Sequence, residues 1–453
     1  MKKYDIIVIG AGTAGMSLVQ TLTAAGWKAA LIEGDYLGGT CINKGCIPSK
    51  TLIASAQVMQ TVREAAEFGV RTQLPQANWE SMVARKDQLV TRIRERSYRR
   101  VEESDRIDLY EGQGSFVDRH TVQVEGEALT SERIVIATGA RSAVPPVPGL
   151  SEVDYLTSTS AMEMKELPKS LFILGGGIIA LEFSQLFARL GVEVTIFERG
   201  SRLASNLDPD ISESVRKILE KEGVRVRTGA SIRSILQDKD KICVIEEGPE
   251  ASLRHTAEKI LVATGRAPNS DRLSLERAGV ETDKRGYITV DDSFATSAPG
   301  IWAAGDVTGG MMFTHRARHD AILLSRWFLH KERAAPSQRL IPFAVFTDPE
   351  IASVGASEEE VVKSGRRPRV HQFPFAFHGR ALAMGKTEGF IKLIVDEEDD
   401  RLLGAHLLGA EAGEIIHELV TAMRFGATLN DLQDMIHVHP TLSEAINSAA
   451  WYG

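Results

Sequence analysis

The feature of this sequence that most constrains its fold is an internal repeat of a strand, a glycine-rich turn and a helix. Residues 6–9 are an apolar run that leads into the turn at 10–15, and residues 171–174 are a second run that leads into the turn at 175–180. One constant offset of 165 positions pairs Gly10 with Gly175, Gly12 with Gly177, Gly15 with Ala180, Gln20 with Gln185, Gly26 with Gly191, and Glu33 with Glu198. One such turn is a weak signal, but two in register predict two dinucleotide-binding βαβ units.

Each position of the repeat has a physical role in binding a dinucleotide. The first glycine permits the tight turn, the second lets the backbone approach a pyrophosphate, and the third small residue packs the helix on the strand. The helix N-terminus then offers its unpaired N–H groups to the phosphates, and the acid that ends the next strand accepts hydrogen bonds from a ribose. These residues are Gly10, Gly12, Gly15 and Glu33 in the first unit, and Gly175, Gly177, Ala180 and Glu198 in the second.

A shorter echo indicates a strand that returns to each nucleotide-binding sheet. Residues 134–139 and 260–265 have nearly the same sequence, and both end in Thr-Gly. The proline-rich segment 145–149 is a stiff linker and a natural boundary. Residues 298–306 are typical of a strand that ends in Gly305-Asp306, where a carboxylate can meet a cofactor.

The pattern changes near residue 341. Residues 390–395 indicate antiparallel strands, and residues 411–424 indicate an amphipathic helix. We therefore predict an α/β protein with two Rossmann-like dinucleotide-binding domains and a C-terminal α+β domain. The expected boundaries are 1–145 for the first part of the first domain, 146–266 for the second domain, 267–340 for the second part of the first domain, and 341–453 for the C-terminal domain.

Composition excludes several classes of protein. The chain has 453 residues, 25% of them charged, and a formal net charge of −8, so disorder and a basic nucleic-acid surface are disfavoured. The arginines of segment 92–100 are interrupted by glutamates, which favours a solvated helix face. The longest apolar runs are too short to span a bilayer. With three cysteines and no signal-peptide pattern, we expect a cytoplasmic enzyme with no nucleic-acid or membrane partner.

Two of the three cysteines lie close together in segment 38–50, directly after the first dinucleotide unit. Cys41 and Cys46 are near enough in sequence to close a small disulfide ring and reopen it, which is the chemistry of a redox relay. Zinc is the main rival, but it needs four ligands and usually a second close pair, so no metal site is predicted. Cys243 stands alone in a strand-like stretch and is expected to be structural.

These features together resemble the flavin-dependent pyridine nucleotide–disulfide oxidoreductases of class I over essentially the whole chain. The motifs at 38–50 and at 437–444 (His437-Val438-His439-Pro440-Thr441-Leu442-Ser443-Glu444) are most similar to those of the dihydrolipoamide dehydrogenases. The resemblance implies a homodimer with residues 341–453 as the interface domain. It implies FAD on the first unit, a nicotinamide nucleotide on the second, and a lipoyl-bearing carrier protein as partner.

The resemblance also assigns cofactor residues by motif position. The expected FAD residues are Gly10, Gly12, Gly15, Glu33, Thr40, Lys50, Gly114, Gly139, Asp306, Met312 and His315. The expected nicotinamide residues are Gly175, Gly177, Ala180, Glu198 and Gly265. An acid at position 198 accepts from a free ribose 2′-hydroxyl and repels a 2′-phosphate, so NAD is favoured over NADP. Arg199 and Arg202 lie close in sequence and could soften that preference.

The catalytic roles follow the same resemblance. Cys41 would exchange with a substrate dithiol, and Cys46 would face the flavin as a thiolate stabilised by nearby positive charge. His439 of one subunit would take the proton of the substrate thiol at the disulfide of the other, and Glu444 would orient its imidazole. Lys50 and Glu182 would form an ion pair beside the flavin.

Some residues depart from this pattern or allow another reading. Lys44 replaces a usually apolar residue. Its charge would either lower a thiolate pKa or shift the potential of the disulfide, or its side chain would point to solvent, and we favour the solvent-facing position. His437 shares a strand-like phase with His439, but no further ligands support a metal site. His315 and His319 carry no metal pattern either.

The sequence therefore predicts a dihydrolipoamide dehydrogenase, and related functions remain as alternatives. A glutathione reductase-like enzyme is weakened by Glu198 and by Ser49, where that enzyme usually has lysine. A mercuric reductase-like enzyme normally carries a terminal cysteine pair, which residues 449–453 lack, although segment 345–349 does resemble it. The high-molecular-weight thioredoxin reductases need a C-terminal redox pair. A non-catalytic flavoprotein is disfavoured by the intact Cys41, Cys46, His439 and Glu444.

Overall fold

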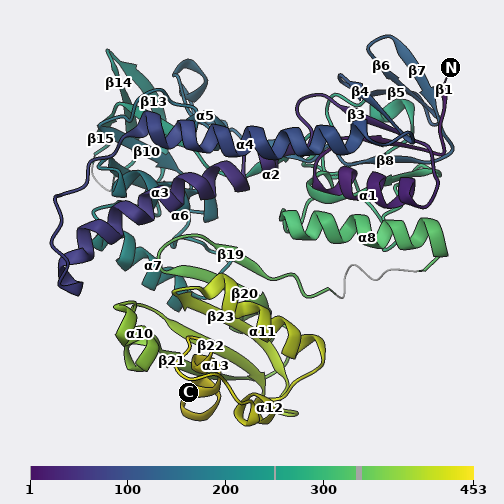
Figure 1. The fold of residues 1–453 in the computed structure, drawn as a ribbon. Coiled ribbons are helices and arrows are strands. Elements are labelled where there is room, and N and C mark those ends of the chain that lie inside the picture. The colour runs from purple at the N-terminus through teal and green to yellow at the C-terminus, as the bar shows by residue number, and fades with distance from the viewer. Residues whose placement is uncertain (1, 249–250, 333–338) are drawn as a thin grey trace.

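The computed structural model describes residues 2–248, 251–332 and 339–453 of the chain. Figure 1 shows two sheet-containing units side by side, joined by two long helices, with the C-terminal domain in yellow below them. The joining helices are α3 (Cys46–Glu64) and α4 (Trp79–Glu102). The α/β class with two dinucleotide units and a C-terminal α+β domain, which the sequence predicted, is confirmed.

The first unit is built on a five-stranded parallel sheet in the order β18-β8-β2-β3-β4. Helices α1 (Thr13–Ala24) and α8 (Thr314–His330) pack together on it (Figure 1). The strands are β2 (Ile6–Ile9), β3 (Ala29–Glu33), β4 (Ile107–Glu111), β8 (Ile134–Ile136) and β18 (Ile301–Ala303). Strand β18 reaches this sheet only after the second unit has been traversed, so one unit interrupts the other.

Smaller elements complete the first unit. A short helix, α2 (Gly39–Asn43), precedes α3. A four-stranded sheet in the order β1-β7-β6-β5 comprises β1 (Lys2–Lys3), β5 (Ser115–Asp118), β6 (Thr121–Val124) and β7 (Glu127–Thr130). The two crossings between the units pair as antiparallel strands, β9 (Ala140–Ser142) and β17 (Arg266–Pro268).

The second unit repeats the plan with a four-stranded parallel sheet in the order β12-β11-β10-β16. Its elements are α5 (Ser158–Ala161), β10 (Ser170–Leu174), α6 (Ile178–Arg189), β11 (Glu193–Glu198), α7 (Pro209–Lys221), β12 (Arg225–Thr228) and β16 (Lys259–Val262). An antiparallel meander, β13 (Ile232–Asp238), β14 (Lys241–Glu246) and β15 (Leu253–Ala257), packs against it. Cys243 is fully buried in β14, in keeping with the structural role expected of it.

The C-terminal domain is an antiparallel sheet in the order β19-β20-β23-β22-β21 with helices against it. Its strands are β19 (Phe343–Val345), β20 (Glu350–Gly355), β21 (Pro368–Pro374), β22 (Phe390–Asp396) and β23 (Leu402–Gly409). Its helices are α9 (Glu358–Lys363), α10 (Gly379–Met384), α11 (Ala412–Arg424), α12 (Leu429–Asp434) and α13 (Glu444–Tyr452).

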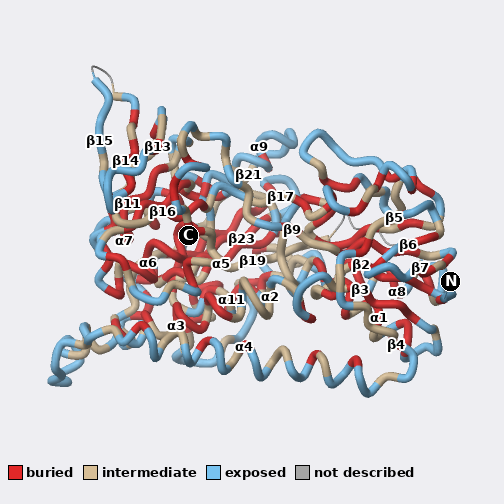
Figure 2. Tube along the Cα trace, turned by 90° about the horizontal axis from the view of Figure 1, so that it is seen from above, coloured by how far each residue is buried: buried red, intermediate tan, exposed pale blue. Residues whose placement is uncertain are grey.

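The core runs through domains rather than stopping at their borders. Figure 2 shows strands such as β2, β3 and β23 buried and much of α4 exposed. The largest apolar cluster joins Leu52 of α3, Phe187 of α6 and Val345 of β19. Burial of such apolar surface is the main favourable term in folding, so α3, the second unit and the C-terminal sheet stabilise one another. The domain boundaries predicted from the sequence stay predictions.

Within the described residues, no helix has the length and apolar composition needed to cross a bilayer. The arginine-rich part of α4 is largely exposed, but Arg94 is not a free surface cation. Its Nε donates to Asn43 Oδ1 at 2.7 Å, and its guanidinium lies 3.8 Å from the centre of the Tyr36 ring. Arg94 therefore ties α4 to the segment that carries the two cysteines.

Candidate active site

The first glycine turn is a tight backbone cradle. Gly10 has φ +104°, and a Cβ there would lie 2.4 Å from the carbonyl oxygen of Ala137. A Cβ on Gly15 would lie 1.9 Å from the carbonyl oxygen of Gly10, so helix α1 approaches the turn as closely as it does only because Gly15 has no side chain. Gly12 precedes α1 as its N-cap, which leaves the first N–H groups of the helix available to a diphosphate.

The second turn repeats this backbone path. Gly175 has φ +102°, and a Cβ there would lie 2.5 Å from the carbonyl oxygen of Ala263. Gly177 is the N-cap of α6, and Ala180 is fully buried at the third position. Both cradles have the shape that a dinucleotide diphosphate requires, so the residues present fit FAD on the first unit and a nicotinamide nucleotide on the second.

The two acids at the strand ends are fixed by backbone donors. Glu33 Oε2 accepts the Ala11 N–H at 2.7 Å, and Oε1 accepts the Asp35 N–H at 2.9 Å. Burial raises the pKa of Glu33 above its usual value. Glu198 Oε1 accepts the Gly200 N–H at 2.5 Å, which is the same contact at the repeat offset. Each carboxylate is therefore held at the position where the sequence placed a ribose ligand.

The two arginines after Glu198 differ in their surroundings. Arg202 NH1 lies 3.3 Å from Glu359 Oε1 of the C-terminal domain, and its NH2 donates to the Ser205 carbonyl of the second unit at 3.1 Å. Arg199 is exposed. A 2′-phosphate on a ribose bound at Glu198 would be repelled by its carboxylate. Arg202 already binds Glu359 and the Ser205 carbonyl.

The remaining expected FAD residues lie around the first cradle. Asp306, in the 3-10 helix that follows β18, is largely buried, and burial raises its pKa despite Arg266 Nε at 3.9 Å. Arg266 Nε is buried and has no hydrogen-bond partner among the described residues. An acceptor and a donor thus stand together in the interior, which suits the hydroxyl groups of a flavin side chain.

Five further FAD positions expected from the sequence differ in their surroundings. Gly114 is buried between Ile9 and Ile32, Gly139 has φ +70°, and Thr40 is exposed on α2. Met312 and His315 stand on either side of the first residue of α8, and His315 Nε2 contacts the Pro342 carbonyl at 2.6 Å. In the second unit, Gly265 has φ +122° with open space where a Cβ would be. Their contacts with a cofactor stay predictions.

The two cysteines lie on consecutive helices, Cys41 inside α2 and Cys46 at the first position of α3. Both thiols are free in the structure, and Cys46 Sγ lies 3.4 Å from Thr314 Oγ1 of α8. A hydrogen bond from the Cys41 thiol is the largest effect that lowers the pKa of Cys46 to about 6, with Thr314 and the Lys50 charge contributing. The same pairing raises the pKa of Cys41. The pair is therefore asymmetric, with the lower thiol pKa at Cys46.

Lys50 and Glu182 form the expected ion pair. Lys50 Nζ lies 2.9 Å from Glu182 Oε1 and 2.8 Å from Oε2, which joins α3 to α6. Glu182 is 6% exposed, so this carboxylate is buried with its partner. Lys50 is one helical turn beyond Cys46 and lowers the pKa of its thiol. Lys44 instead pairs with Asp35 near the surface, in line with the favoured solvent-facing interpretation.

His439 and Glu444 form a second polar pair, in the C-terminal domain. His439 Nδ1 lies 2.9 Å from Glu444 Oε1, and Glu444 Oε2 accepts the Thr441 N–H at 2.8 Å. The backbone hydrogen bond from Thr441, together with His439, lowers the pKa of Glu444. The His439 side chain is 80% exposed, so its ring is free to meet another surface. Between described residues, no hydrogen bond or ion pair links this dyad to the cysteines of the same chain.

Three residues of the site were not singled out from the sequence. Thr314 contacts Cys46, although only its segment was noted. The Phe346 N–H donates to Glu182 Oε1 at 3.0 Å, and its ring lies 4.8 Å from Lys50 Nζ. Asn43 Nδ2 donates to the Leu37 and Gly39 carbonyls at 3.0 Å and shapes the cysteine segment. Asn43 was visible within the cysteine motif, whereas Phe346 was noted only as part of segment 345–349, with no indication that it contacts Glu182 or Lys50.

The histidines considered for metal binding have other partners. His437 Nε2 lies 2.7 Å from Glu418 Oε1, and His319 Nδ1 lies 3.2 Å from Arg339 NH1. No group of three or more His, Cys, Asp and Glu side chains in the described ranges is arranged to hold a metal ion.

Comparison with known proteins gives the same picture over nearly the whole chain. The family model described as pyridine nucleotide-disulphide oxidoreductase matches residues 4–321, and the model of its dimerisation domain matches residues 341–450. A mercuric reductase of Staphylococcus aureus is 37% identical, with 99% of this chain and 82% of the relative covered. A dihydrolipoyl dehydrogenase of Bacillus subtilis is 35% identical, with 99% and 97% covered.

Among solved structures, the Cu(II) complex of the HOCl-induced flavoprotein disulfide reductase RclA from Escherichia coli superposes with a TM-score of 0.91. It is 35% identical in sequence, and the match covers 99% of both chains. The relatives therefore divide between thiol and metal substrates while sharing one architecture.

Proposed function

Since this chain belongs to the pyridine nucleotide-disulphide oxidoreductase family, whose members depend on FAD and use NAD(P)H, we propose that it is a dihydrolipoamide dehydrogenase. It would oxidise a dihydrolipoyl group through a Cys41–Cys46 disulfide and pass the electrons to NAD+. The observation that carries this proposal is the His439–Glu444 dyad, with Nδ1 and Oε1 2.9 Å apart and the ring exposed. A dithiol substrate needs a base, and this dyad has the composition and geometry of one.

The proton chemistry begins at His439. A thiol is mostly protonated near neutral pH, so His439 Nε2 would take the proton from the first substrate thiol. The Glu444 carboxylate holds the ring by Nδ1 and stabilises the imidazolium that forms. The family's dimerisation domain supports a homodimer, in which the dyad of one subunit would serve the cysteines of the other.

The sulfur chemistry then uses the asymmetry of the cysteine pair. The substrate thiolate attacks Cys41 Sγ, a new S–S bond forms, and the Cys41–Cys46 bond breaks with Cys46 leaving as a thiolate. His439 passes the first proton to solvent and then takes the proton of the second substrate thiol, and this thiolate attacks the substrate sulfur bonded to Cys41. This step releases the cyclic substrate disulfide, and Cys41 leaves as a thiol after taking a proton from the imidazolium. Cys41 has no S–H to donate while it is bonded to the substrate, but Thr314 and the Lys50 charge still lower the pKa of Cys46, which makes Cys46 a better leaving group.

When bound, FAD would supply a two-electron acceptor for the reduced cysteines, and NAD+ would supply the final hydride acceptor. Lys50 keeps a positive charge beside the Cys46 thiolate, while Glu182 and the helix α3 N-terminus hold that arrangement in place. Glu198 favours NAD over NADP, because its carboxylate accepts from a ribose hydroxyl and repels a phosphate. A lipoyl-bearing carrier protein would bring the dithiol to the dimer interface.

The test replaces the base and separates the two half-reactions. In His439→Gln, turnover of dihydrolipoamide should fall by about 10²–10⁴-fold, since general-base catalysis contributes that much. Flavin reduction by NADH, followed by stopped-flow absorbance, should stay near the wild-type rate. Full activity of His439→Gln with dihydrolipoamide would overturn the role of the dyad.

A second candidate is NAD(P)H-driven reduction of a metal ion, favoured by the 37% identity to a mercuric reductase. Side-by-side assays with dihydrolipoamide, glutathione disulfide, mercuric ion and cupric ion decide between the candidates. The dithiol proposal expects dihydrolipoamide to have the highest kcat/KM and the only strong dependence on His439. A metal reductase would instead turn over a metal ion fastest and tolerate His439→Gln.

A further inference from the structure

A side-chain amide joins helix α6 to the segment after β19. Gln185 Oε1 accepts the Asp348 N–H at 2.7 Å, and Gln185 Nε2 donates to the Asp348 carbonyl at 2.8 Å. We call this two-point contact the Gln185 bracket. Gln185 is 4% exposed, so the bracket satisfies backbone groups that water does not reach well. It fixes residues 346–348 of the C-terminal domain against the second unit.

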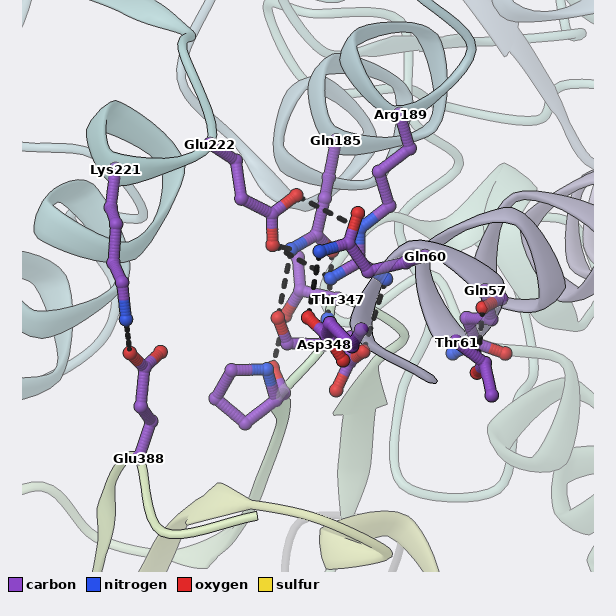
Figure 3. A network of polar contacts seen from close by, with 12 residues as sticks. Gln57, Gln60, Thr61, Gln185, Arg189, Lys221, Glu222, Thr347, Asp348 and Glu388 are labelled. Carbon is purple, nitrogen blue, oxygen red and sulfur yellow. Dashed lines mark hydrogen bonds and ion pairs between the residues drawn. The ribbon is translucent and has the colours of Figure 1, made fainter. Parts of the chain in front are cut away.

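An ion pair reinforces the bracket one turn further along α6. Arg189 NH1 lies 3.0 Å from Asp348 Oδ2, and Arg189 NH2 and Nε lie 2.6 and 2.8 Å from the Glu222 carboxylate (Figure 3). Arg189 is 5% exposed. Burial alone would lower the pKa of Arg189, but hydrogen bonds and charge from Glu222 and Asp348 outweigh it and raise the pKa. A paired buried charge of this kind is costly to disrupt by removal of one partner.

The segment held in this way touches both members of the Lys50–Glu182 pair. The Phe346 backbone N–H donates to Glu182 Oε1 at 3.0 Å, and Lys50 Nζ lies 4.8 Å from the centre of the Phe346 ring. Glu182, Gln185 and Arg189 follow one another along α6 at intervals of three and four residues, so they share one face of the helix. The contact of Glu182 with Phe346 and the contact of Gln185 with Asp348 are therefore neighbouring parts of one surface between α6 and residues 346–348.

From this continuity we propose that Gln185 and Asp348 are positioning residues for the Cys46 thiolate. The Gln185 bracket holds Phe346 so that its N–H shares the charge of Glu182 and its ring confines Lys50, which keeps the Lys50 charge near Cys46. The C-terminal domain thus acts on the cysteines of its own subunit as well as contributing to dimerisation. This inference rests on the redox role proposed for Cys46 but not on the identity of the substrate.

The direction of the effect follows from the charges around Cys46. Lys50 favours the thiolate, whereas Glu182 opposes it. Without the Phe346 N–H, the Glu182 carboxylate would act on Cys46 with its full charge and would draw Lys50 more strongly to itself. Both changes disfavour the thiolate, so a loosened bracket should move the titration of Cys46 to higher pH.

The experiment uses the FAD-loaded protein reduced by two electrons and titrates Cys46 in two ways. The thiolate-to-flavin charge-transfer absorbance and the rate of Cys46 alkylation by iodoacetamide are followed against pH. The wild type should give a midpoint near the pKa of about 6. Gln185→Met removes the bracket and should raise the midpoint by about one pH unit, whereas Asp348→Asn keeps the backbone contacts, weakens the Arg189 ion pair and should raise the midpoint by less. Glu182→Gln removes the charge that opposes the Cys46 thiolate and should lower the midpoint.

The matched control is Lys221→Gln. Lys221 pairs with Glu388 across the same two domains, yet Figure 3 shows this pair apart from Arg189 and its partners. The Lys221 side chain is 74% exposed. The control should leave the midpoint unchanged. An unshifted midpoint in a folded, FAD-containing Asp348→Asn or Gln185→Met protein, or an equal shift in Lys221→Gln, overturns the proposal. Because no dithiol is used, lack of dihydrolipoamide activity would overturn the proposed function alone.

Discussion

The two glycine turns follow the same backbone path, but the chain closes over them differently. In both, the segment after the acid returns to the turn: the Gly38 N–H donates to the Ala11 carbonyl at 2.9 Å, and the Ala204 N–H donates to the Gly176 carbonyl at 2.7 Å. Only in the first unit does the returning segment continue as a helix across the turn. A Cβ on Gly39 of α2 would lie 2.7 Å from Gly12 Cα, whereas a Cβ on Gly177 would meet nothing within 4 Å.

This difference separates a site that keeps its ligand from one that exchanges it. The helix that closes the first turn carries Cys41, so the covering segment and the redox segment are the same piece of chain. We expect a nucleotide bound under this helix to leave only when the segment that carries the cysteines moves. The second turn is open at Gly177, as a nucleotide that binds and leaves in each turnover requires. Four substitutions test this comparison.

The largest effect is expected for Gly15→Ala in the first turn. The new Cβ would lie 1.9 Å from the Gly10 carbonyl oxygen, so α1 must shift, at a cost of at least about 3 kcal/mol of folding free energy. FAD content and thermal unfolding measure the loss. Gly177→Ala, with open space around it, should cost less than about 1 kcal/mol. Equal losses in the two variants would show that the close approach at Gly15 does not make the first turn less tolerant of a side chain than Gly177 is.

An intermediate effect is expected for Glu198→Ala in the second turn. Loss of a charged acceptor is worth about 1.5–3 kcal/mol, so NADH affinity should fall at least tenfold. NADPH affinity should fall less, because the repulsion of a 2′-phosphate disappears as well. Isothermal titration with both nucleotides measures the change, and FAD content serves as the control. A variant that loses FAD while binding NADH normally would contradict the assignment of the two units.

The smallest effect is expected for Arg94→Gln on α4. It removes the 2.7 Å hydrogen bond to Asn43 and the contact with the Tyr36 ring, which together should cost about 1 kcal/mol. FAD should then dissociate a few times faster, which dialysis against FAD-free buffer would measure, while NADH affinity stays the same. No change in the FAD dissociation rate would mean that α4 does not help to close the first turn.

The sequence predicted the parts of this comparison that are local. The repeat offset located both turns. Glu33 and Glu198 each accept a hydrogen bond from the backbone N–H of the residue two positions later in the chain. The Lys50–Glu182 pair came from the family resemblance, and the structure confirms the pairing, 132 positions apart in the chain. That the cysteine segment crosses Gly12 depends on the direction in which α2 leaves Gly38, and no periodicity reports that direction.

Contacts between domains could not be predicted in the same way. Phe346 reaches Glu182 because the C-terminal sheet packs on α6, and Arg202 turns from the nucleotide site because Glu359 of α9 lies within reach. Both depend on the relative placement of units whose sequences are far apart. The disulfide itself, the subunit that His439 serves and the cofactor contacts of residues such as Met312 stay predictions.

The return of β18 to the first sheet has a consequence for synthesis of the chain. Strand β8 ends at Ile136, but its neighbour β18 begins only at Ile301, after all four strands of the second parallel sheet. At about 5–20 residues per second, a ribosome needs on the order of ten seconds to make the intervening stretch. The unit whose synthesis starts first is therefore finished second, and for that interval its β8 edge has no partner strand.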